Sequence, residues 1–211
     1  MGFADKTGYS GSGFVRLAGS SRDIISDPAL YLDARNNTAA GTHDDNAATW
    51  TDTANTFNIF NVNGCNWTAN SLVIPSDSLA YGHTPEISQG TVELVFKTGS
   101  MTYSSNIALI AEDGTVVTDI APYSTDKRYY IAIAFADTVS VYVDGTKVQS
   151  DVDITKLKDI NGNIEFSIGI DGTEDTFTGE ICSSRVYNRA LMANEIRNNY
   201  LYDIKRYREV I

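Results

Sequence analysis

The sequence is poor in cysteine, histidine and long apolar runs, and each scarcity removes a class of protein. The two cysteines, Cys65 and Cys182, are too few for a disulfide scaffold and lack the Cys-x-x-Cys spacing of a zinc site. We expect free buried thiols, with a disulfide between them as the alternative. The two histidines, His43 and His83, are expected in loops, and without a Gly-x-Ser-x-Gly motif they predict no nucleophilic triad. No apolar run approaches the ~18–20 residues that span a bilayer, so no membrane partner is expected.

Basic residues are also scarce, because 16 Lys and Arg stand against 27 Asp and Glu, for a net charge of −11. A nucleic-acid partner is not expected, since phosphate binding needs a basic face. The charge is uneven: residues 185–211 carry a net charge of +3, which leaves −14 for the rest. This basic end is either a solvated helix face or a docking end for an acidic neighbour.

Hydrophobic residues make up 42% of the 211 positions, enough for the core of a single domain. Alternating or β-rich runs recur between turn residues, as a sandwich requires. These runs are 30–34, where the sandwich is expected to start, 57–62, 71–74, 90–97, 107–111, 116–120, 129–135, 139–143, 147–148, 164–170 and 177–187. An Asp-Gly pair at 144–145 predicts a tight hairpin. The pattern predicts an all-β, antiparallel two-sheet sandwich.

Residues 1–28 do not share the strand pattern. They are rich in Gly, Ser and Thr and read as an extended arm. Spaced apolar residues along it predict docking on a partner, with a disordered leader as the alternative. These candidate docking residues are Phe3, Tyr9, Phe14 and Leu17. The arm lacks the apolar core of a signal peptide, so synthesis in a cytoplasm is expected.

Residues 192–211 have apolar side chains at helical spacing and predict a short amphipathic helix packed on the sandwich or on a partner. The residue at the expected cap is Met192, whose side chain has no oxygen to offer the N–H of Glu195. We therefore expect the helix to lack its capping box and to be held by packing.

The segment at 179–200, GEICSSRVYNRALMANEIRNNY, resembles the closing strand and capping turn of laminin-G-like, concanavalin A-like jelly-roll domains, with the usual form G-x-I-D-x-V-R-I-Y-N-R-A-L-S-x-x-E-I. The hairpin SVYVDGTKV at 140–148 is similar to that family's hairpin. The resemblance covers about 30–208 and implies a jelly roll over 29–191. Trp50 and Asp52 match a W-x-D loop of the family, but the glycines that usually follow are absent.

This fold hosts lectins, glycanases and adhesins, so function must be argued from side chains. A glycanase needs two carboxylates about 5–10 Å apart. Glu93 and Glu165 each stand alone in a β-run, so no enzyme is expected. Sugar binding without hydrolysis needs an exposed aromatic ring beside polar groups. The loop candidates for such a platform are Trp67, Tyr81, Tyr103 and Tyr123.

Related lectin-like domains often carry Ca²⁺ at the rim of the sandwich, which makes Ca²⁺ the cofactor to consider. The candidate ligands are Asp171, Glu174 and Asp175, which cluster in a turn. A second candidate is the loop at 43–46, whose acidic residues read equally as an exposed polar tip.

The segment DARNNT at 33–38, the YNRAL motif and the C-terminal tail resemble most the lectin-like domains of bacteriophage and prophage structural proteins. The resemblance implies a non-enzymatic virion protein, made in the host cytoplasm and displayed on a capsid or tail. Its implied partners are other virion proteins, with host glycans and a homo-oligomer as further candidates. The alternative is a cellular carbohydrate-binding module or adhesin domain, extracellular or at the cell surface.

Overall fold

The computed structural model describes residues 24–54, 59–75, 79–83, 87–99, 106–110, 116–122, 124, 127–153, 155, 167–169 and 178–207. In chain order its elements are β1 (Leu30–Asp33), the 3-10 turn η1 (Ala34–Asn36), β2 (Thr49–Thr51), β3 (Ile59–Asn63), β4 (Asn66–Thr68), β5 (Ser71–Ile74), β6 (Leu79–His83), β7 (Gly90–Thr98), β8 (Asn106–Ile110), β9 (Val116–Pro122), β10 (Arg128–Phe135), β11 (Val139–Val143), β12 (Thr146–Val152), β13 (Ser167–Gly169), β14 (Gly179–Tyr187) and α2 (Ala193–Arg206).

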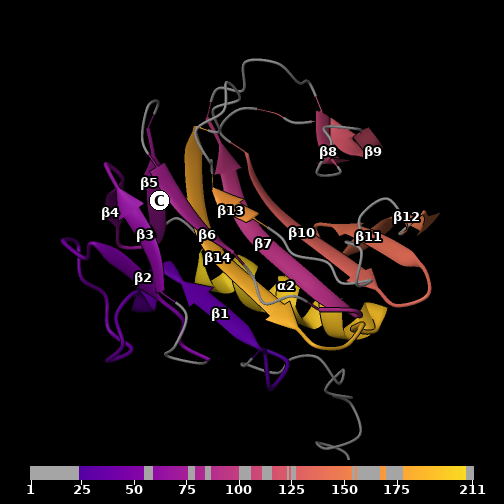
Figure 1. Cartoon of the computed structure of the whole chain (residues 1–211), viewed down its shortest axis with the longest axis horizontal. Helices are drawn as coiled ribbons and strands as arrows, with labels where there is room; N and C mark the ends of the chain where they lie inside the picture. The colour runs from indigo at the N-terminus through magenta and orange to yellow at the C-terminus, as the bar shows by residue number, and fades with distance from the viewer. Residues whose placement is uncertain are drawn as a thin grey trace, which may run out of the picture.

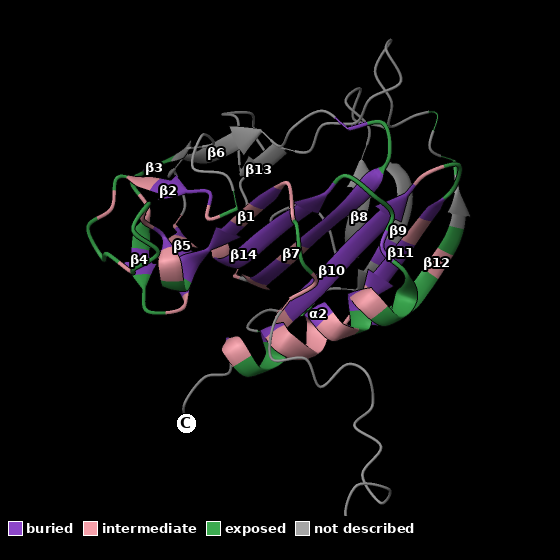
Figure 2. Ribbon diagram, turned by 90° about the horizontal axis from the view of Figure 1, so that it is seen from below, coloured by how far each residue is buried: buried purple, intermediate pink, exposed green. Residues whose placement is uncertain are grey.

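Within the described residues, eight strands form one antiparallel sheet in the order β12-β11-β10-β7-β14-β5-β4, with β1 also paired to β14. A second sheet has the order β13-β6-β3-β2, and β8 pairs with β9. The second sheet lies over one face of the large sheet and α2 lies on the other (Figures 1 and 2). This confirms the predicted all-β jelly-roll sandwich with a short C-terminal helix.

Strand β10 shows why the large sheet can be covered on both faces (Figure 2). Ile131 and Ile133 belong to the core between the two sheets, while Ala132 and Ala134 belong to a second core beneath α2. Successive side chains of a strand point to opposite faces, so a strand buried on both faces is apolar throughout. The small alanines leave room for the helix to approach the sheet.

The predicted hairpin forms between β11 and β12. Asp144 and Gly145 have φ angles of 49° and 72°, as a two-residue turn of this kind requires. Gly145 also lies against α2, because a Cβ at this position would be 2.6 Å from Cδ1 of Tyr200. The same glycine therefore serves the turn and the packing of the helix.

Three strands have no counterpart among the predicted runs. β2 and β4 have three residues each, too few to show a period of two. β6 takes in Tyr81 and His83, which we expected in loops. Cys65 and Cys182 are both free thiols, as expected, but only Cys182 is buried; Cys65 is partly exposed. The described residues contain no helix of the length and apolarity that a bilayer crossing requires.

Candidate functional site

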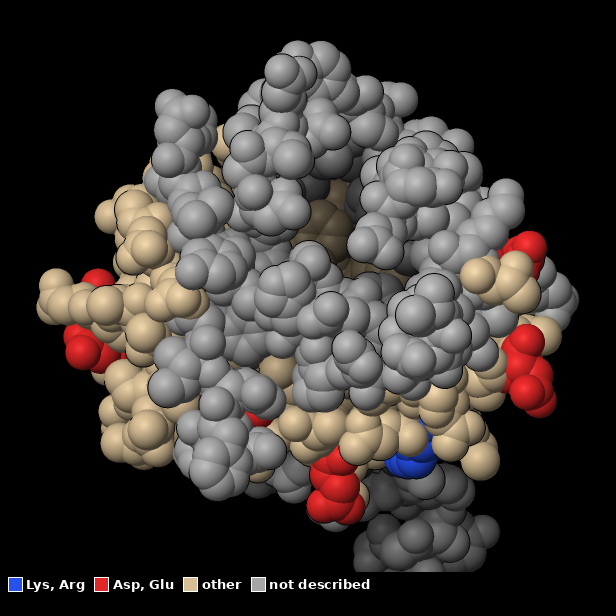
Figure 3. All heavy atoms as spheres, viewed as in Figure 1, with Lys and Arg blue, Asp and Glu red and all other residues tan. Residues whose placement is uncertain are grey.

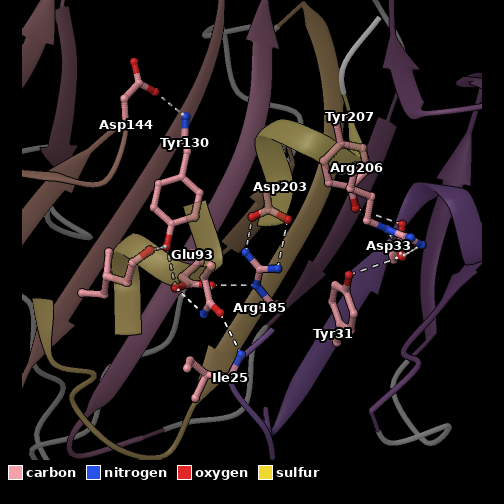
Figure 4. Close-up of polar contacts among 12 residues, drawn as sticks. Ile25, Tyr31, Asp33, Glu93, Tyr130, Asp144, Arg185, Asp203, Arg206 and Tyr207 are labelled. Atoms are coloured by element: carbon pink, nitrogen blue, oxygen red, sulfur yellow. Dashed lines mark hydrogen bonds and ion pairs between the residues drawn. The ribbon is translucent and has the colours of Figure 1, made fainter. Parts of the chain in front are cut away.

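A group of buried polar side chains joins α2 to the large sheet, and we call it the helix–sheet network (Figure 4). It consists of Glu93 on β7, Tyr130 on β10, Arg185 on β14, and Asn199 and Asp203 on α2. Arg185 and Glu93 lie directly opposite each other in the pairing of β14 with β7. The register of these strands therefore brings a cation and an anion together on the face that α2 covers.

Arg185 is the centre of the network. Its Nε donates to Oε2 of Glu93 at 2.6 Å. Its Nη1 donates to Oδ1 of Asp203 at 3.1 Å, and Nη2 donates to the other oxygen of that carboxylate. The guanidinium thus bridges a strand and the helix, using the fork geometry that suits arginine to carboxylates.

Glu93 receives two further donors. The hydroxyl of Tyr130 donates to Oε1 at 2.6 Å, and Nδ2 of Asn199 lies 2.9 Å and 3.0 Å from the two carboxylate oxygens. Burial, followed by the charge of Glu93, holds the pKa of Tyr130 well above its ordinary value, so this hydroxyl keeps its proton. Both carboxylate oxygens of Glu93 therefore have hydrogen-bond donors, although the residue is only 1% exposed.

Asp203 has a different environment. Burial raises its pKa to about 6, and the attraction of Arg185 opposes this only in part. Burial acts to lower the pKa of Arg185, but Asp203 and Glu93 outweigh it, and the result lies well above the ordinary value. Arg185 therefore stays charged, whereas the pKa of Asp203 lies above its ordinary value.

The C-terminal end of α2 is fastened by a second set of contacts. Asp33, the last residue of β1, accepts from Nε of Arg206 and from the hydroxyl of Tyr207, each at 2.9 Å. Arg35 donates from Nη1 to the carbonyl of Arg206 at 2.7 Å, and Arg128 donates to the carbonyl of Tyr207. The last carbonyls of a helix lack partners within it and carry partial negative charge, so these cations stabilise its end.

The N-terminal end of α2 corrects one expectation. Met192 makes no side-chain capping bond, as expected. The other half of a capping box is nevertheless present, because Glu195 accepts from the backbone N–H of Met192 at 2.8 Å. Arg189 donates to both oxygens of Glu195 at 2.8 Å and 2.7 Å. The helix is therefore capped by a carboxylate as well as held by packing.

The segment that precedes β1 also contacts the network. The N–H of Ile25 donates to Oδ1 of Asn199 at 2.8 Å, and the hydroxyl of Tyr187 donates to the carbonyl of Ile25 at 3.2 Å. The side chain of Ile25 packs against the core beneath α2. The described segment before β1 therefore lies beneath α2.

This arrangement is suited to holding elements together and unsuited to hydrolysis. The side chains of Glu93 and Asp203 are only 1% and 2% exposed, and both are bound to Arg185. A glycosidase carboxyl must reach the leaving oxygen of a substrate, which these two cannot. The sequence carried one signal that we missed: Asn199 and Asp203 lie four residues apart on the buried stripe of α2, where apolar residues are expected.

The candidate sugar platform at Trp67 is wrong in its placement. Trp67 lies on β4 rather than in a loop, is 9% exposed, and donates from Nε1 to the carbonyl of Ala47 at 2.8 Å. Its ring packs edge-to-face against Trp50, with centroids 5.2 Å apart, and against His43 at 6.2 Å. The indole completes the core at this end of the sandwich and offers no open face to a ligand.

The other candidates fall wholly or partly outside the described residues. Tyr81 lies on β6, paired with β3 and β13, but its side chain is not described. Those wholly outside are Tyr103, Tyr123, Asp171, Glu174, Asp175 and the arm residues Phe3, Tyr9, Phe14 and Leu17. In the 43–46 loop, His43 contacts the carbonyl of Ala34 and Oδ1 of Asp45 at 2.7 Å and 2.8 Å. The described part of the chain holds no group of three acidic, His or Cys side chains suited to a metal ion.

The described ends of three strands lie side by side at one end of the large sheet. Lys97 near the end of β7 lies opposite Arg128 at the start of β10, and Thr98 lies opposite Gly179 at the start of β14. The connections that contain residues 103, 123 and 171–175 leave from or arrive at these three strands. We call this end of the large sheet the β7/β10/β14 end.

A family model described as the concanavalin A-like lectin/glucanases superfamily matches residues 73–197, more than half of the chain. The chain belongs to this superfamily. The matched residues run from β5 into α2 and include Glu93, Tyr130 and Arg185. None of the curated protein sequences compared with the chain matches it.

Solved structures similar to this superfamily member include Trypanosoma rangeli sialidase, with a TM-score of 0.62, 16% identity, and coverage of 85% of this chain and 33% of the sialidase. The complex of that sialidase with sialic acid matches with a TM-score of 0.61 and the same identity and coverage. Domain 4 of AbnA, an extracellular arabinanase from Geobacillus stearothermophilus, in complex with arabinotriose, has a TM-score of 0.61 and 15% identity, with 82% of this chain and 98% of that domain covered. The chain thus spans about a third of the sialidase and nearly all of the arabinanase domain.

Proposed function

We propose that this chain is a non-catalytic, lectin-like module that binds a glycan at the β7/β10/β14 end of its sandwich. The observation that carries the proposal is the match to the arabinanase domain over 98% of its length, because that domain was solved with an oligosaccharide bound. The match to the sialidase covers only 33% of the enzyme and gives no reason to assign its activity.

The described carboxylates support binding without hydrolysis. Glu93 and Asp203 are enclosed and bound to Arg185. Glu180 on β14 accepts from the hydroxyl of Ser71 at 2.9 Å and lies 3.7 Å from Nζ of Lys97. Although Glu180 is more accessible, it is held by partners, and no second carboxyl is paired with it in the described part of the chain. Retaining and inverting glycosidases of most families need such a pair.

Charge favours a neutral glycan over an acidic one. The net charge of −11 repels polyanionic saccharides at long range. On the face drawn in Figure 3, the described residues show more acidic than basic surface. Apolar and aromatic surfaces suit the C–H faces of neutral sugars, with a few polar groups to read hydroxyls. We therefore expect a neutral oligosaccharide as ligand.

The test is a glycan array followed by calorimetry with the best oligosaccharide. Tyr103→Ala and Tyr123→Ala remove the two aromatics whose connections reach the β7/β10/β14 end. At least one of them should weaken binding about tenfold, because the loss of a stacked ring costs about 1.4 kcal/mol of binding free energy. The matched control is Tyr202→Ala on α2, on the opposite face of the sheet, which should bind as wild type. Failure to bind any glycan, or release of free sugar, would contradict the proposal.

A finer form of this proposal is display on a bacteriophage capsid or tail, with other virion proteins as partners and the virion as its location. The resemblance of residues 33–38 and 187–191 motivates it. Arg197 and Lys205 lie exposed on α2, and a basic helix face supports docking on an acidic neighbour. The test is co-sedimentation of the protein with phage particles that lack it. If the protein stays in the supernatant at low salt, display on a virion is contradicted. The alternative, a cellular glycan-binding module, would then remain.

A further inference from the structure

The charges in the helix–sheet network do not balance. Glu93 and Asp203 are two buried acids, and among the described residues Arg185 is the one cation that contacts them. The nearby guanidinium of Arg206 is bound to Asp33 instead. Two carboxylates that share one guanidinium in a dry site leave one surplus negative charge, and such a site favours the uptake of a proton.

The hydrogen bonds identify which acid takes the proton. Glu93 accepts from Arg185, Tyr130 and Asn199, so its ionised form is stabilised from three elements. Asp203 has Arg185 as its single donor residue in the described part of the chain. Fewer donors stabilise the charge of Asp203, and its carboxyl is as deeply buried as that of Glu93.

We propose that Asp203 is a protonation switch, which fastens α2 to the sheet more firmly in mild acid than at neutral or alkaline pH. Protonation removes the surplus charge, and the carbonyl oxygen of the protonated carboxyl still accepts from Arg185. Deprotonation restores two anions around one cation and weakens the attachment of α2. Asn199 on the same helix holds Ile25, so the switch acts on both ends of the described chain.

The direction of the effect follows from the pKa of Asp203, which burial raises from 3.8 to about 6. A group whose pKa is higher in the folded than in the unfolded state stabilises the folded state fully at pH values below its unfolded-state pKa, here 3.8. This stabilisation is lost as the pH rises through about 6. The difference corresponds to roughly a hundredfold change in the folding equilibrium.

Charged groups and phenols on the neighbouring strands surround Asp203. Arg185 on β14 stays charged, because the pKa of its guanidinium is raised well above the ordinary value. Asp33 on β1 is bound to Arg206 and Tyr207, and Arg128 on β10 donates to the carbonyl of Tyr207. The surrounding phenols have pKa values raised mainly by burial and remain neutral; they are Tyr31, Tyr130, Tyr187 and Tyr207.

The experiment is hydrogen exchange of the α2 amides in the full chain at about pH 4.5 and about pH 8, expressed as protection factors corrected for intrinsic rates. Wild-type α2 should be more protected at the lower pH, by up to about thirtyfold, since at about pH 4.5 the effect is not yet complete. Asp203→Asn, which mimics the neutral carboxyl, should show the same protection at both pH values. The matched control Asp137→Asn, at an exposed turn after β10, should keep the wild-type dependence.

Equal protection of wild-type α2 at the two pH values would overturn the proposal, as would an Asp203→Asn protein that keeps the full dependence. If that variant does not fold, the carboxyl carbon of Asp203 can be titrated by NMR in the wild-type protein. A midpoint near 6 supports the switch, and a midpoint near the ordinary value of 3.8 overturns it.

Discussion

Replacing Arg185 by methionine is the sharpest test of what holds α2 in place. Methionine keeps the apolar stem of the arginine and removes its charge and donors. Glu93 and Asp203 would then be buried without the cation that binds both. Removing one partner from a buried ion pair typically costs 3–5 kcal/mol, because the remaining charge is uncompensated.

That loss is large against the 5–15 kcal/mol by which domains of this kind are stable. We expect the urea midpoint to fall accordingly, with the denaturant slope unchanged, when unfolding is followed by circular dichroism. Arg197→Met, at an exposed position on the same helix, is the control and should stay within about 0.5 kcal/mol of wild type.

A triple variant separates charge from packing. Combining Arg185→Met with Glu93→Gln and Asp203→Leu removes all three charges, and it should recover much of the lost stability, since well-packed neutral replacements of buried ion pairs are often tolerated. A loss below about 1 kcal/mol for Arg185→Met alone would refute the reasoning, because it would mean that the two carboxylates are not held by this guanidinium.

Two further substitutions test the elements around the network. Gly145→Ala places a Cβ 2.6 Å from the ring of Tyr200 at a φ of +72°, and should cost about 2 kcal/mol or more in thermal unfolding; an unchanged melting temperature would contradict the turn geometry. Glu195→Ala removes the acceptor for the N–H of Met192 and should cost about 1 kcal/mol; no loss in urea unfolding would show that this carboxylate is not the cap.

The parts of the fold that could be predicted from the sequence are those with a local signal. The runs at 71–74 and 139–143 became β5 and β11 with the predicted bounds, and the Asp-Gly pair became the hairpin turn. The YNRAL segment indicated the superfamily that the family model supports. For the strands and the turn, the signal lies within the element itself.

The site could not be predicted, because its partners are distant in sequence. Glu93 stood alone in its strand, and it meets Arg185 and Asn199, 92 and 106 residues away, only after β7 and β14 pair in register and α2 covers them. Trp67 looked like a loop aromatic because the three-residue β4 shows no period. Its indole is buried because Nε1 donates to the carbonyl of Ala47, 20 residues away, and the ring packs against Trp50.

Saturation-transfer NMR on a mixture of the protein with neutral oligosaccharides tests binding and the lack of catalysis together. We predict transfer from the protein to at least one oligosaccharide, with no new reducing-end signals as the sample ages. Appearance of new anomeric signals, or no transfer to any sugar in the mixture, would contradict the proposal that this sandwich binds glycans without cleaving them.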